Sequence, residues 1–467
     1  MWLLTDSFKA LALRIALIRN AKKTIRVQTF IWGEDDLSFY LINELVGAAK
    51  RGVKVQLLID GWVGVDNPSL IRILKDINDV VESKHFNPPS KVVCPSFVRL
   101  IRAASVNARQ MNHRMHAKSF IVDDKWSILG GRNYESRYFG IDPKKFFQDR
   151  EVLLYGEAST DVVKAFNNFW DSGLSKDTAE LTFTYSKDIP EGKKFKRFYR
   201  INVPEKLVEP EETELLKLFQ DWFKKFSISS FLLREKTTVE NVSILYDPPK
   251  VTSDKISGSA NLILEKVLAA ESEIIMQTPY LVFSDKMLSA LRFFKEKEGT
   301  MNFRFVTNSY GTTDNIIAHL LGLKERSFLY ENGSIEIFEF LEDPNNLRAN
   351  HPITANLCVH SKTMIIDSKY SYVGSSNFDP RSQFYNSEIG MLVCDQGFAG
   401  KLKNDINKEL ETPHLLSSKK TIEEIGYLDK LKELFLALNP SFKPSRIGRT
   451  IAYFFRFLIP MRLKNLF

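Results

Sequence analysis

The chain carries one long motif twice, and this repeat restricts its fold more than any other feature. The first copy reads HAKSFIVDDKWSILGGRN from His116, and the second reads HSKTMIIDSKYSYVGSSN from His360, at an offset of 360 − 116 = 244 residues. Earlier in each half, the predicted strands KKTIRVQTFIW and SEIIMQTPYL place Gln28 and Gln277 at a similar offset, 277 − 28 = 249. Two landmarks at nearly equal offsets indicate a duplicated half rather than chance similarity.

Both halves alternate predicted strands and helices in the same order, which indicates the α/β class. In each half the first strand is followed by a helical stretch and then by a second buried strand, VKVQLLID or FRFVTN. A length of 467 residues also exceeds one ordinary hydrophobic core. We therefore expect a first half over 1–181, a linker and insertion over 182–242, and a second half over 243–430.

The chain ends in a segment of different character, 431–467, which we expect to form a basic amphipathic tail. At helical spacing its apolar side chains form one stripe, with three arginines opposite: Ile447, Ile451, Phe454, Phe455 and Leu458, against Arg446, Arg449 and Arg456. Such a helix is typical of an anionic membrane interface. The alternative is a helix packed on the protein's own core.

The repeated motif combines three side chains at fixed spacing in each half: His116, Lys118 and Asp123 in the first, and His360, Lys362 and Asp367 in the second. Because the chain has seven histidines, average residue frequencies predict roughly 0.03 such matches by chance. The motif is typical of a strand, in which histidine and lysine share one face and aspartate points to the other. On the shared face an imidazole can attack or protonate a phosphate group while the ammonium group neutralises one of its oxygens. We include the aspartates in the catalytic motif, with a structural role.

Groups near the motif complete the predicted site. A nucleophilic histidine must be neutral, and its second ring nitrogen needs a partner that fixes its orientation. Each half offers a carboxylate for this purpose: Asp149 in the first half, with Glu151 as an alternative, and Glu388 in the second. We expect the phosphate oxygens to be bound by residues that follow the motif, namely Gly131, Asn133, Ser375 and Asn377.

Either half alone would be an incomplete site. Two halves about a pseudo-twofold axis would place two histidines and two lysines around one phosphodiester, with one histidine as nucleophile and the other as general acid. The histidine that attacks first is left open, with a weak preference for His116. His113 and His116 are spaced as helical metal ligands, but no cluster of Cys, Asp or Glu accompanies them. We therefore expect no metal and no cofactor.

These motifs resemble those of the phospholipase D superfamily. NHRMHAKSFIVDD with GGRNYESRYFG, and VHSKTMIIDSKYSYVGSSNFDPRSQFYNSEIG, are most similar to the bacterial cardiolipin synthase branch, especially its C type. The resemblance covers nearly the whole chain and is weakest in the middle linker. It implies two mixed-sheet α/β halves that share one central cleft, a covalent phosphohistidine, no metal, and transfer of a phosphatidyl group to an acceptor alcohol such as phosphatidylglycerol.

Hydrolysis and non-catalytic lipid binding are the two alternatives to transfer. A hydrolase would use water as the acceptor, on a phospholipid or, less favoured, on nucleic acid, whereas non-catalytic lipid binding would require damaged motifs. The net charge of +8 fits either polyanion. Because the clearest basic and aromatic cluster lies in the tail, we expect anionic phospholipid substrates at a peripheral membrane surface and no nucleic acid. The sequence leaves open whether an accessory protein is required.

The N-terminal region lacks the pattern of an export signal. The first thirty residues contain Asp6, Lys9 and Arg14 where a signal peptide would be apolar, and the chain begins almost at its first predicted helix. No uninterrupted apolar run reaches the roughly eighteen residues of a membrane-spanning helix. We therefore expect a bacterial protein that is cytoplasmic or peripheral on the inner face of the cytoplasmic membrane.

Overall fold

The computed structural model describes residues 1–64, 67–95, 110–183, 213–249, 256–296, 301–309, 311–319, 321–322, 329, 335–341, 356–411 and 415–417. Within these ranges, no helix is long and apolar enough to cross a bilayer. The predicted tail over 431–467 lies outside them. Its apolar stripe and its arginines therefore stay predictions.

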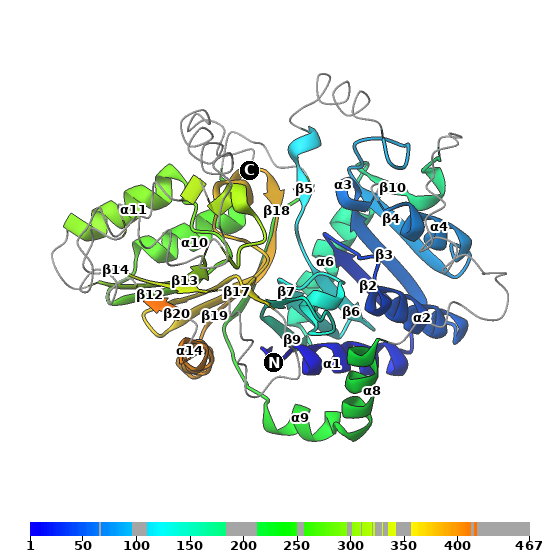
Figure 1. Ribbon diagram of the computed structural model, residues 1–467, viewed down its shortest axis with the longest axis horizontal. Coiled ribbons are helices and arrows are strands. Elements are labelled where there is room, and N and C mark those ends of the chain that lie inside the picture. Colours follow the sequence, from blue (N-terminus) through cyan, green and yellow to red (C-terminus); the bar gives the residue numbers. More distant parts are fainter. Residues whose placement is uncertain are drawn as a thin grey trace.

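The first half builds one mixed sheet, which contains eight strands among the described residues (Figure 1). Their spatial order is β1 (Trp2–Leu4), β9 (Glu151–Tyr155), β7 (Trp126–Gly130), β6 (Ser119–Val122), β2 (Thr24–Thr29), β3 (Lys54–Asp60), β4 (Val81–Phe86) and β10 (Ser175–Asp177). Strands β2, β3 and β4 run parallel to one another. The other neighbours in the sheet are antiparallel.

The second half builds a sheet of the same kind, again with eight strands in the described part of the chain. Their order is β11 (Val242–Tyr246), β19 (Ile389–Cys394), β17 (Tyr370–Gly374), β16 (Thr363–Ile366), β12 (Glu273–Gln277), β13 (Asn302–Asn308), β14 (Ile335–Phe340) and β20 (Leu415–Ser417). Strands β12, β13 and β14 are the parallel ones. Order and direction thus match the first sheet position by position.

The pairing register confirms the repeat predicted from the sequence. Gln28 lies opposite Ser119 in the first sheet, and Gln277 lies opposite Thr363 in the second. Ser119 and Thr363 each stand three residues after a motif histidine, so both landmarks have the same neighbours. The predicted α/β fold of two pseudo-symmetric mixed-sheet halves is confirmed.

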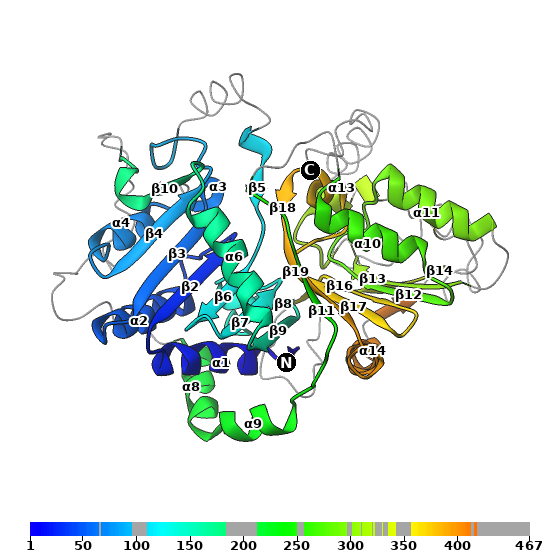
Figure 2. The same ribbon diagram turned by 180° about the vertical axis from the view of Figure 1, so that it is seen from behind.

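Helices cover both faces of each sheet (Figures 1 and 2). In the first half they are α1 (Ser7–Asn20), α2 (Asp36–Lys50), α3 (Gly61–Gly64), α4 (Pro68–Asp76), η1 (Ser136–Tyr138), α6 (Ala158–Trp170) and η2 (Thr178–Glu180). In the second half they are α10 (Gly258–Leu268), α11 (Asp285–Glu296), α13 (Pro380–Phe384) and α14 (Gln396–Leu410). Side chains alternate along the strands, so Phe120 of β6 joins the core under α1 and α2, while Ile121 joins the core under α6.

The region expected to be a linker contributes two helices to the first half. They are α8 (Glu214–Lys225) and α9 (Ile228–Arg234), which lie beside α1 in Figure 1. Phe219 of α8 is buried, and its ring lies 5.4 Å from the ring of Phe8 on α1. The described part of this region is therefore packed on the core that α1 covers.

Two short parallel strand pairs join the halves. Strand β5 (Arg114–Met115) pairs with β18 (Asn386–Ser387), and β8 (Lys145–Gln148) pairs with β15 (Asn356–Val359). Each pair combines one strand from each half, as the side-by-side position of β5 and β18 shows in Figures 1 and 2. Apolar side chains of both sheets also share one core, which includes Leu129 of β7 and Val373 of β17. The two halves therefore form one packed unit.

Candidate active site

The strand pairs between the halves place the two motif histidines. His116 follows β5, and its main-chain N–H donates to the carbonyl oxygen of Ser387 at 3.0 Å. His360 follows β15, and its main-chain N–H donates to the carbonyl oxygen of Gln148 at 2.7 Å. Both histidine side chains are buried. Each half thus fixes the backbone position of the other half's histidine.

The predicted carboxylates orient the histidines across the same junction. Nδ1 of His116 lies 2.8 and 3.0 Å from the two carboxylate oxygens of Glu388, and Nδ1 of His360 lies 2.6 Å from Oδ2 of Asp149. Because an ionised carboxylate only accepts hydrogen bonds, the Glu388 contacts assign the proton of His116 to Nδ1 and leave a lone pair on its Nε2, and Asp149 favours the same tautomer of His360. The alternative partner Glu151 accepts instead from Arg14 at 2.5 Å and from Arg132 at 3.2 Å. Asp149 and Glu388 are therefore the residues in place to orient the imidazoles.

Each orienting carboxylate contacts the residue that follows the first glycine of its own half's motif, and this residue is different in the two halves. A Cβ atom added at Gly131 would lie 2.3 Å from Oδ1 of Asp149, so only glycine leaves this carboxylate its place. At the equivalent position, Ser375 donates its hydroxyl to Oε2 of Glu388 at 2.6 Å. The halves thus use a glycine with aspartate and a serine with glutamate.

The motif lysines and histidines form a compact group of buried polar side chains. Nζ of Lys118 donates to the carbonyl oxygen of His116 at 2.6 Å, and Nζ of Lys362 lies 2.7 Å from Nδ1 of His360. Burial lowers the pKa of Lys118 to about 7 and also lowers the pKa of Lys362. These ammonium groups have lost most of their hydration, which favours binding of an anion between them.

Burial also keeps the free imidazoles neutral near pH 7. It lowers the pKa of His116 to about 4 and that of His360 well below its usual value. Burial raises the pKa of Glu388, but the hydrogen bonds from His116 and Ser375 and the positive charge of Lys118 outweigh it, so the net pKa is lowered. The result is a neutral imidazole with a free Nε2, held by an ionised carboxylate, which is the state a nucleophile requires.

The motif aspartates make structural contacts. Asp123 accepts three main-chain N–H groups from the segment that enters β2, and Asp367 accepts three from the segment that enters β12: Lys22, Lys23 and Thr24, then Glu271, Ser272 and Glu273. Both aspartates have a φ of 52°, in the left-handed region that aspartate tolerates better than most residues. These contacts match the structural role that strand alternation predicts for them.

Two of the residues expected to bind phosphate also donate to protein groups. The Asn133 amide donates to the Tyr138 hydroxyl at 2.8 Å, and its oxygen accepts from the main-chain N–H of Ile31 at 3.1 Å. The Ser375 hydroxyl is directed to Glu388, as described above. Phosphate contacts from all four residues, Gly131, Asn133, Ser375 and Asn377, stay predictions, and Asn377 is 9% exposed.

Tyr138 is a site residue that the motif analysis missed. Its hydroxyl lies 3.4 Å from Nε2 of His360, and its ring meets the imidazole edge to face at 5.0 Å. The residue at the equivalent position of the second half is Ser382. A comparison of the two repeats therefore gives no signal for this tyrosine. The sequence offers only its position, five residues after the motif in an aromatic stretch.

His113 and Arg114 lie on the His116 side of the junction. Nε2 of His113 lies 2.8 Å from the Ser387 hydroxyl, and Nη1 of Arg114 donates to Oδ1 of Asp60 at 3.1 Å. Throughout the described ranges, no group of three or more His, Cys, Asp or Glu side chains is arranged to hold a metal ion. His113 thus has a hydroxyl partner, and Arg114 forms a buried ion pair.

Comparisons with known proteins agree with this geometry. A family model described as "Cardiolipin synthase, PLD-like domain" matches residues 14–170 and 263–410, one segment in each half. Cardiolipin synthase C of Escherichia coli is 29% identical over 414 residues, which are 85% of this chain and 81% of that protein. An uncharacterized protein of Helicobacter pylori is 28% identical over 403 residues, 86% of this chain and 77% of the relative.

A solved structure shares the fold of the described residues. The crystal structure of phosphatidylserine synthase from Haemophilus influenzae superposes with a TM-score of 0.63 at 15% sequence identity. The match covers 100% of this chain and 95% of that one. Together with the two family segments, and with the paired histidines and their carboxylates at the junction, this places the chain in a defined family. The chain is an enzyme of the cardiolipin synthase family with phospholipase D-like domains.

Proposed function

We propose that this enzyme transfers a phosphatidyl group from one anionic phospholipid to an acceptor alcohol, such as phosphatidylglycerol, through a phosphohistidine. The observation that supports the proposal is that the histidine of each half is oriented by a carboxylate of the other half. His116 with Glu388 and His360 with Asp149 provide two oriented imidazoles, each with a lysine two residues later. Two imidazoles with separate tasks are what a two-step displacement at phosphorus requires.

In the first step, Nε2 of His116 attacks phosphorus while the bond from phosphorus to the leaving alcohol oxygen breaks. His360, protonated once the anionic substrate is bound, gives its Nε2 proton to that oxygen. In the second step, Nε2 of His360 takes the proton of the acceptor alcohol, whose oxygen attacks phosphorus. The bond from phosphorus to His116 then breaks, and the free enzyme is regenerated with the same protons.

Differences between the two imidazoles support this assignment of roles. The Tyr138 hydroxyl accepts from the Asn133 amide, so its own proton can be donated to Nε2 of His360 at 3.4 Å while that imidazole is neutral. Lys362 also contacts Nδ1 of His360, whereas Lys118 contacts only the main chain of His116. A hydrogen-bond donor and a cation next to His360 make it a poorer nucleophile and a stronger acid. His116 is the better nucleophile.

The two motif lysines would neutralise the phosphate oxygens during transfer. Both are buried beside the histidines, where an ammonium group interacts with an anion much more strongly than in water. Because the proposed substrates are lipids of a bilayer, we also infer that the enzyme works on a membrane surface. The predicted basic tail over 431–467 would supply the attachment.

The experiment that tests the function is a product analysis by mass spectrometry. Purified protein is incubated with phosphatidylglycerol, with and without phosphatidylethanolamine, and the reaction is also quenched to look for a phosphatidyl adduct on the His116 peptide. Cardiolipin together with free glycerol is the expected result, and the adduct should be absent in His116→Ala. Phosphatidic acid as the sole product would replace the proposal by hydrolysis, and an adduct on His360 would reverse the two roles.

A further inference from the structure

A tyrosine and an aspartate outside the repeated motif form a pair at one edge of the second sheet. Tyr280 lies three residues after β12, and Asp314 lies in the segment after β13. The Tyr280 hydroxyl donates to Oδ1 of Asp314 at 2.8 Å. Because β12 and β13 are parallel neighbours, both segments leave the sheet at the same edge. The Asp314 side chain is exposed to solvent.

This pair is tied to the backbone that carries His360. The side-chain amide of Asn308, at the end of β13, donates to the carbonyl oxygens of Val359 at 2.7 Å and Pro279 at 3.2 Å. Its oxygen accepts from the main-chain N–H of Val359 at 2.7 Å. Val359 directly precedes His360, and Pro279 directly precedes Tyr280. Asn308 therefore holds the backbone before Tyr280 next to the backbone before His360.

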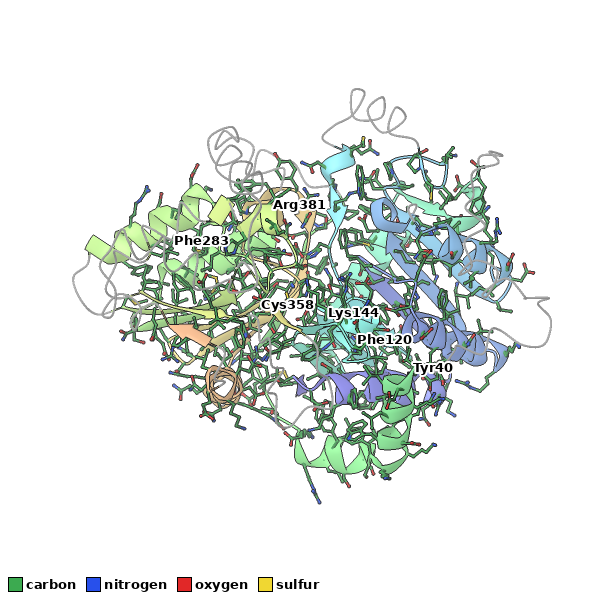
Figure 3. All side chains as sticks on the ribbon, in the orientation of Figure 1. Tyr40, Phe120, Lys144, Phe283, Cys358 and Arg381 are labelled. Atoms are coloured by element: carbon green, nitrogen blue, oxygen red, sulfur yellow. The ribbon has the colours of Figure 1, made fainter. Side chains whose placement is uncertain are left out.

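A second observation places Asp314 near the same strand. Burial raises the pKa of the Cys358 thiol, two residues before His360, and the negative charge of Asp314 raises it further. Figure 3 labels Cys358, which lies centrally between the two halves. Burial lowers the pKa of His360, and the negative charge of Asp314 opposes this effect. The Asp314 carboxylate is therefore close enough to interact electrostatically with a group bound beside the His360 imidazole.

The charges around His116 are of the opposite kind. Arg114 and Arg381 lie on that side, and Figure 3 shows Arg381 where the two halves meet. The nearby carboxylate of Asp60 accepts from Arg114 and from the main-chain N–H groups of Met115 and Trp62. Its oxygens are thus occupied by protein donors. The two sides of the site differ although the folds that build them are repeats.

The reaction places two different alcohols on the His360 side. In an in-line displacement the leaving oxygen departs opposite the attacking nitrogen, and the acceptor oxygen must later approach from that same direction. Both alcohols therefore occupy one subsite next to His360. A carboxylate there accepts hydrogen bonds from hydroxyl or ammonium groups and is repelled by a second anion.

We propose that Asp314, positioned by Tyr280, is a specificity-determining residue that selects the alcohol on the His360 side. It favours alcohols that carry a further hydrogen-bond donor, hydroxyl or ammonium, on the carbon adjacent to the one that bears the reacting oxygen. This inference rests on the proposed transfer function, and it makes Asp314 the residue that recognises the polar headgroup of the alcohol. Glycerol and the glycerol headgroup of a phospholipid satisfy the requirement, as does ethanolamine, whereas a simple alkanol does not.

The test is a competition between acceptor alcohols at a fixed donor. A short-chain phosphatidyl p-nitrophenyl ester in detergent is the donor, because its leaving group offers Asp314 no hydrogen bond and its release can be followed by absorbance. Glycerol, ethanolamine and 1-propanol compete as acceptors, and the three lipid products are quantified by mass spectrometry. The proteins are the wild type, Asp314→Ala, Asp314→Asn, Tyr280→Phe and, as a control, Glu271→Gln, which also removes one exposed negative charge from the second half.

Asp314→Ala should lower the ratios of glycerol and ethanolamine products to the propanol product by about tenfold or more. Asp314→Asn should keep most of the preference for glycerol and lose that for ethanolamine, since an amide still accepts from a hydroxyl but lacks charge. Tyr280→Phe should shift the ratios in the same direction by a smaller factor, and Glu271→Gln should leave them unchanged.

A purely structural role, or an effect on His360 alone, would lower all three products by one common factor. Equal losses, or unchanged ratios in Asp314→Ala, would therefore overturn the inference while leaving transfer intact. Wild-type protein that releases p-nitrophenol but forms only phosphatidic acid would instead refute the transfer function, and the selection of alcohols with it.

Discussion

Replacing Gly131 by alanine should remove most of the activity by displacing one carboxylate. The new Cβ would lie 2.3 Å from Oδ1 and 2.4 Å from Oδ2 of Asp149, whereas ordinary contacts begin at 3.4 Å, so the carboxylate must move by about 1 Å (3.4 − 2.3 = 1.1). Its 2.6 Å contact with Nδ1 of His360 would then stretch to roughly 3.6 Å, which is beyond a hydrogen bond. A displacement of this size costs about a hundredfold in kcat, or about 2.7 kcal/mol.

The assay is p-nitrophenol release from the short-chain phosphatidyl ester, with thermal melting measured on the same samples. Gly400→Ala is the matched control, because a Cβ at Gly400 in α14 has no atom within 4 Å and alanine is the better helix former. It should keep full activity and melt at the same or a slightly higher temperature. Overpacking at Gly131 should lower the stability by about 1–3 kcal/mol, too little to explain a hundredfold loss in the folded fraction.

A compensating pair of changes tests the geometry directly. The second half uses Ser375 with Glu388 where the first uses Gly131 with Asp149. Gly131→Ser combined with Asp149→Glu should therefore recover more activity than Gly131→Ser alone, because it recreates a pair that the fold already accommodates. The reasoning is refuted if Gly131→Ala keeps more than about a third of the wild-type rate, or if the double variant is no better than the single one.

His116→Ala and His360→Ala should each abolish turnover, and the double variant should be no slower than either, since both groups serve one reaction; a single variant with more than about a tenth of the rate would contradict two essential roles. The value of kcat/KM should fall as the pH rises above about 7, where Lys118 loses its charge, and a flat profile up to pH 9 would show that this ammonium group does not bind the phosphate. His85 is buried with its pKa lowered to about 4 by burial, so the unfolded state binds its proton first as the pH falls below about 6.5, and up to about 3 kcal/mol of stability is lost by pH 4. His85→Gln should therefore reduce the drop in Tm between pH 7 and pH 5, and an unchanged drop would assign acid sensitivity to other groups. Cutting the chain after Pro444 should weaken co-sedimentation with anionic liposomes, with a loss that shrinks as salt rises, because each basic residue near the surface contributes about 1 kcal/mol; unchanged binding with a lower Tm would instead place the tail on the protein core.

The sequence predicted the features that depend on local geometry and on the repeat. Strand alternation assigned Asp123 to the face away from His116, and its three main-chain contacts match that assignment. The equal offsets predicted two sheets with one topology, and the strand orders agree. Both predictions use only neighbours along one strand or the comparison of one half with the other, and neither requires the relative placement of the halves.

The features that the sequence could not supply depend on how the halves meet. Glu388 binds His116 across 272 residues, so the choice between an intra-half and an inter-half partner had no local signal. Comparison of repeats finds only what the two copies share. Tyr138 and Asp314 belong to one half each, and this kind of comparison therefore passes over them. For Asn133, a motif shows that the group is polar but not that its amide donates to Tyr138, and its predicted phosphate contact stays a prediction.

The strand pairs β5–β18 and β8–β15 also determine how lipids can exchange. A hinge motion that parted the halves would break the main-chain hydrogen bonds of both histidines and separate both imidazoles from their carboxylates. It would also break the contacts of the buried Arg150 with Gln277 and Glu409. Opening of the two halves would thus disrupt the candidate active site itself. In the proposed transfer, the leaving and acceptor alcohols would therefore have to exchange while the two halves stay together, with the phosphatidyl group held on a histidine whose backbone both halves fix.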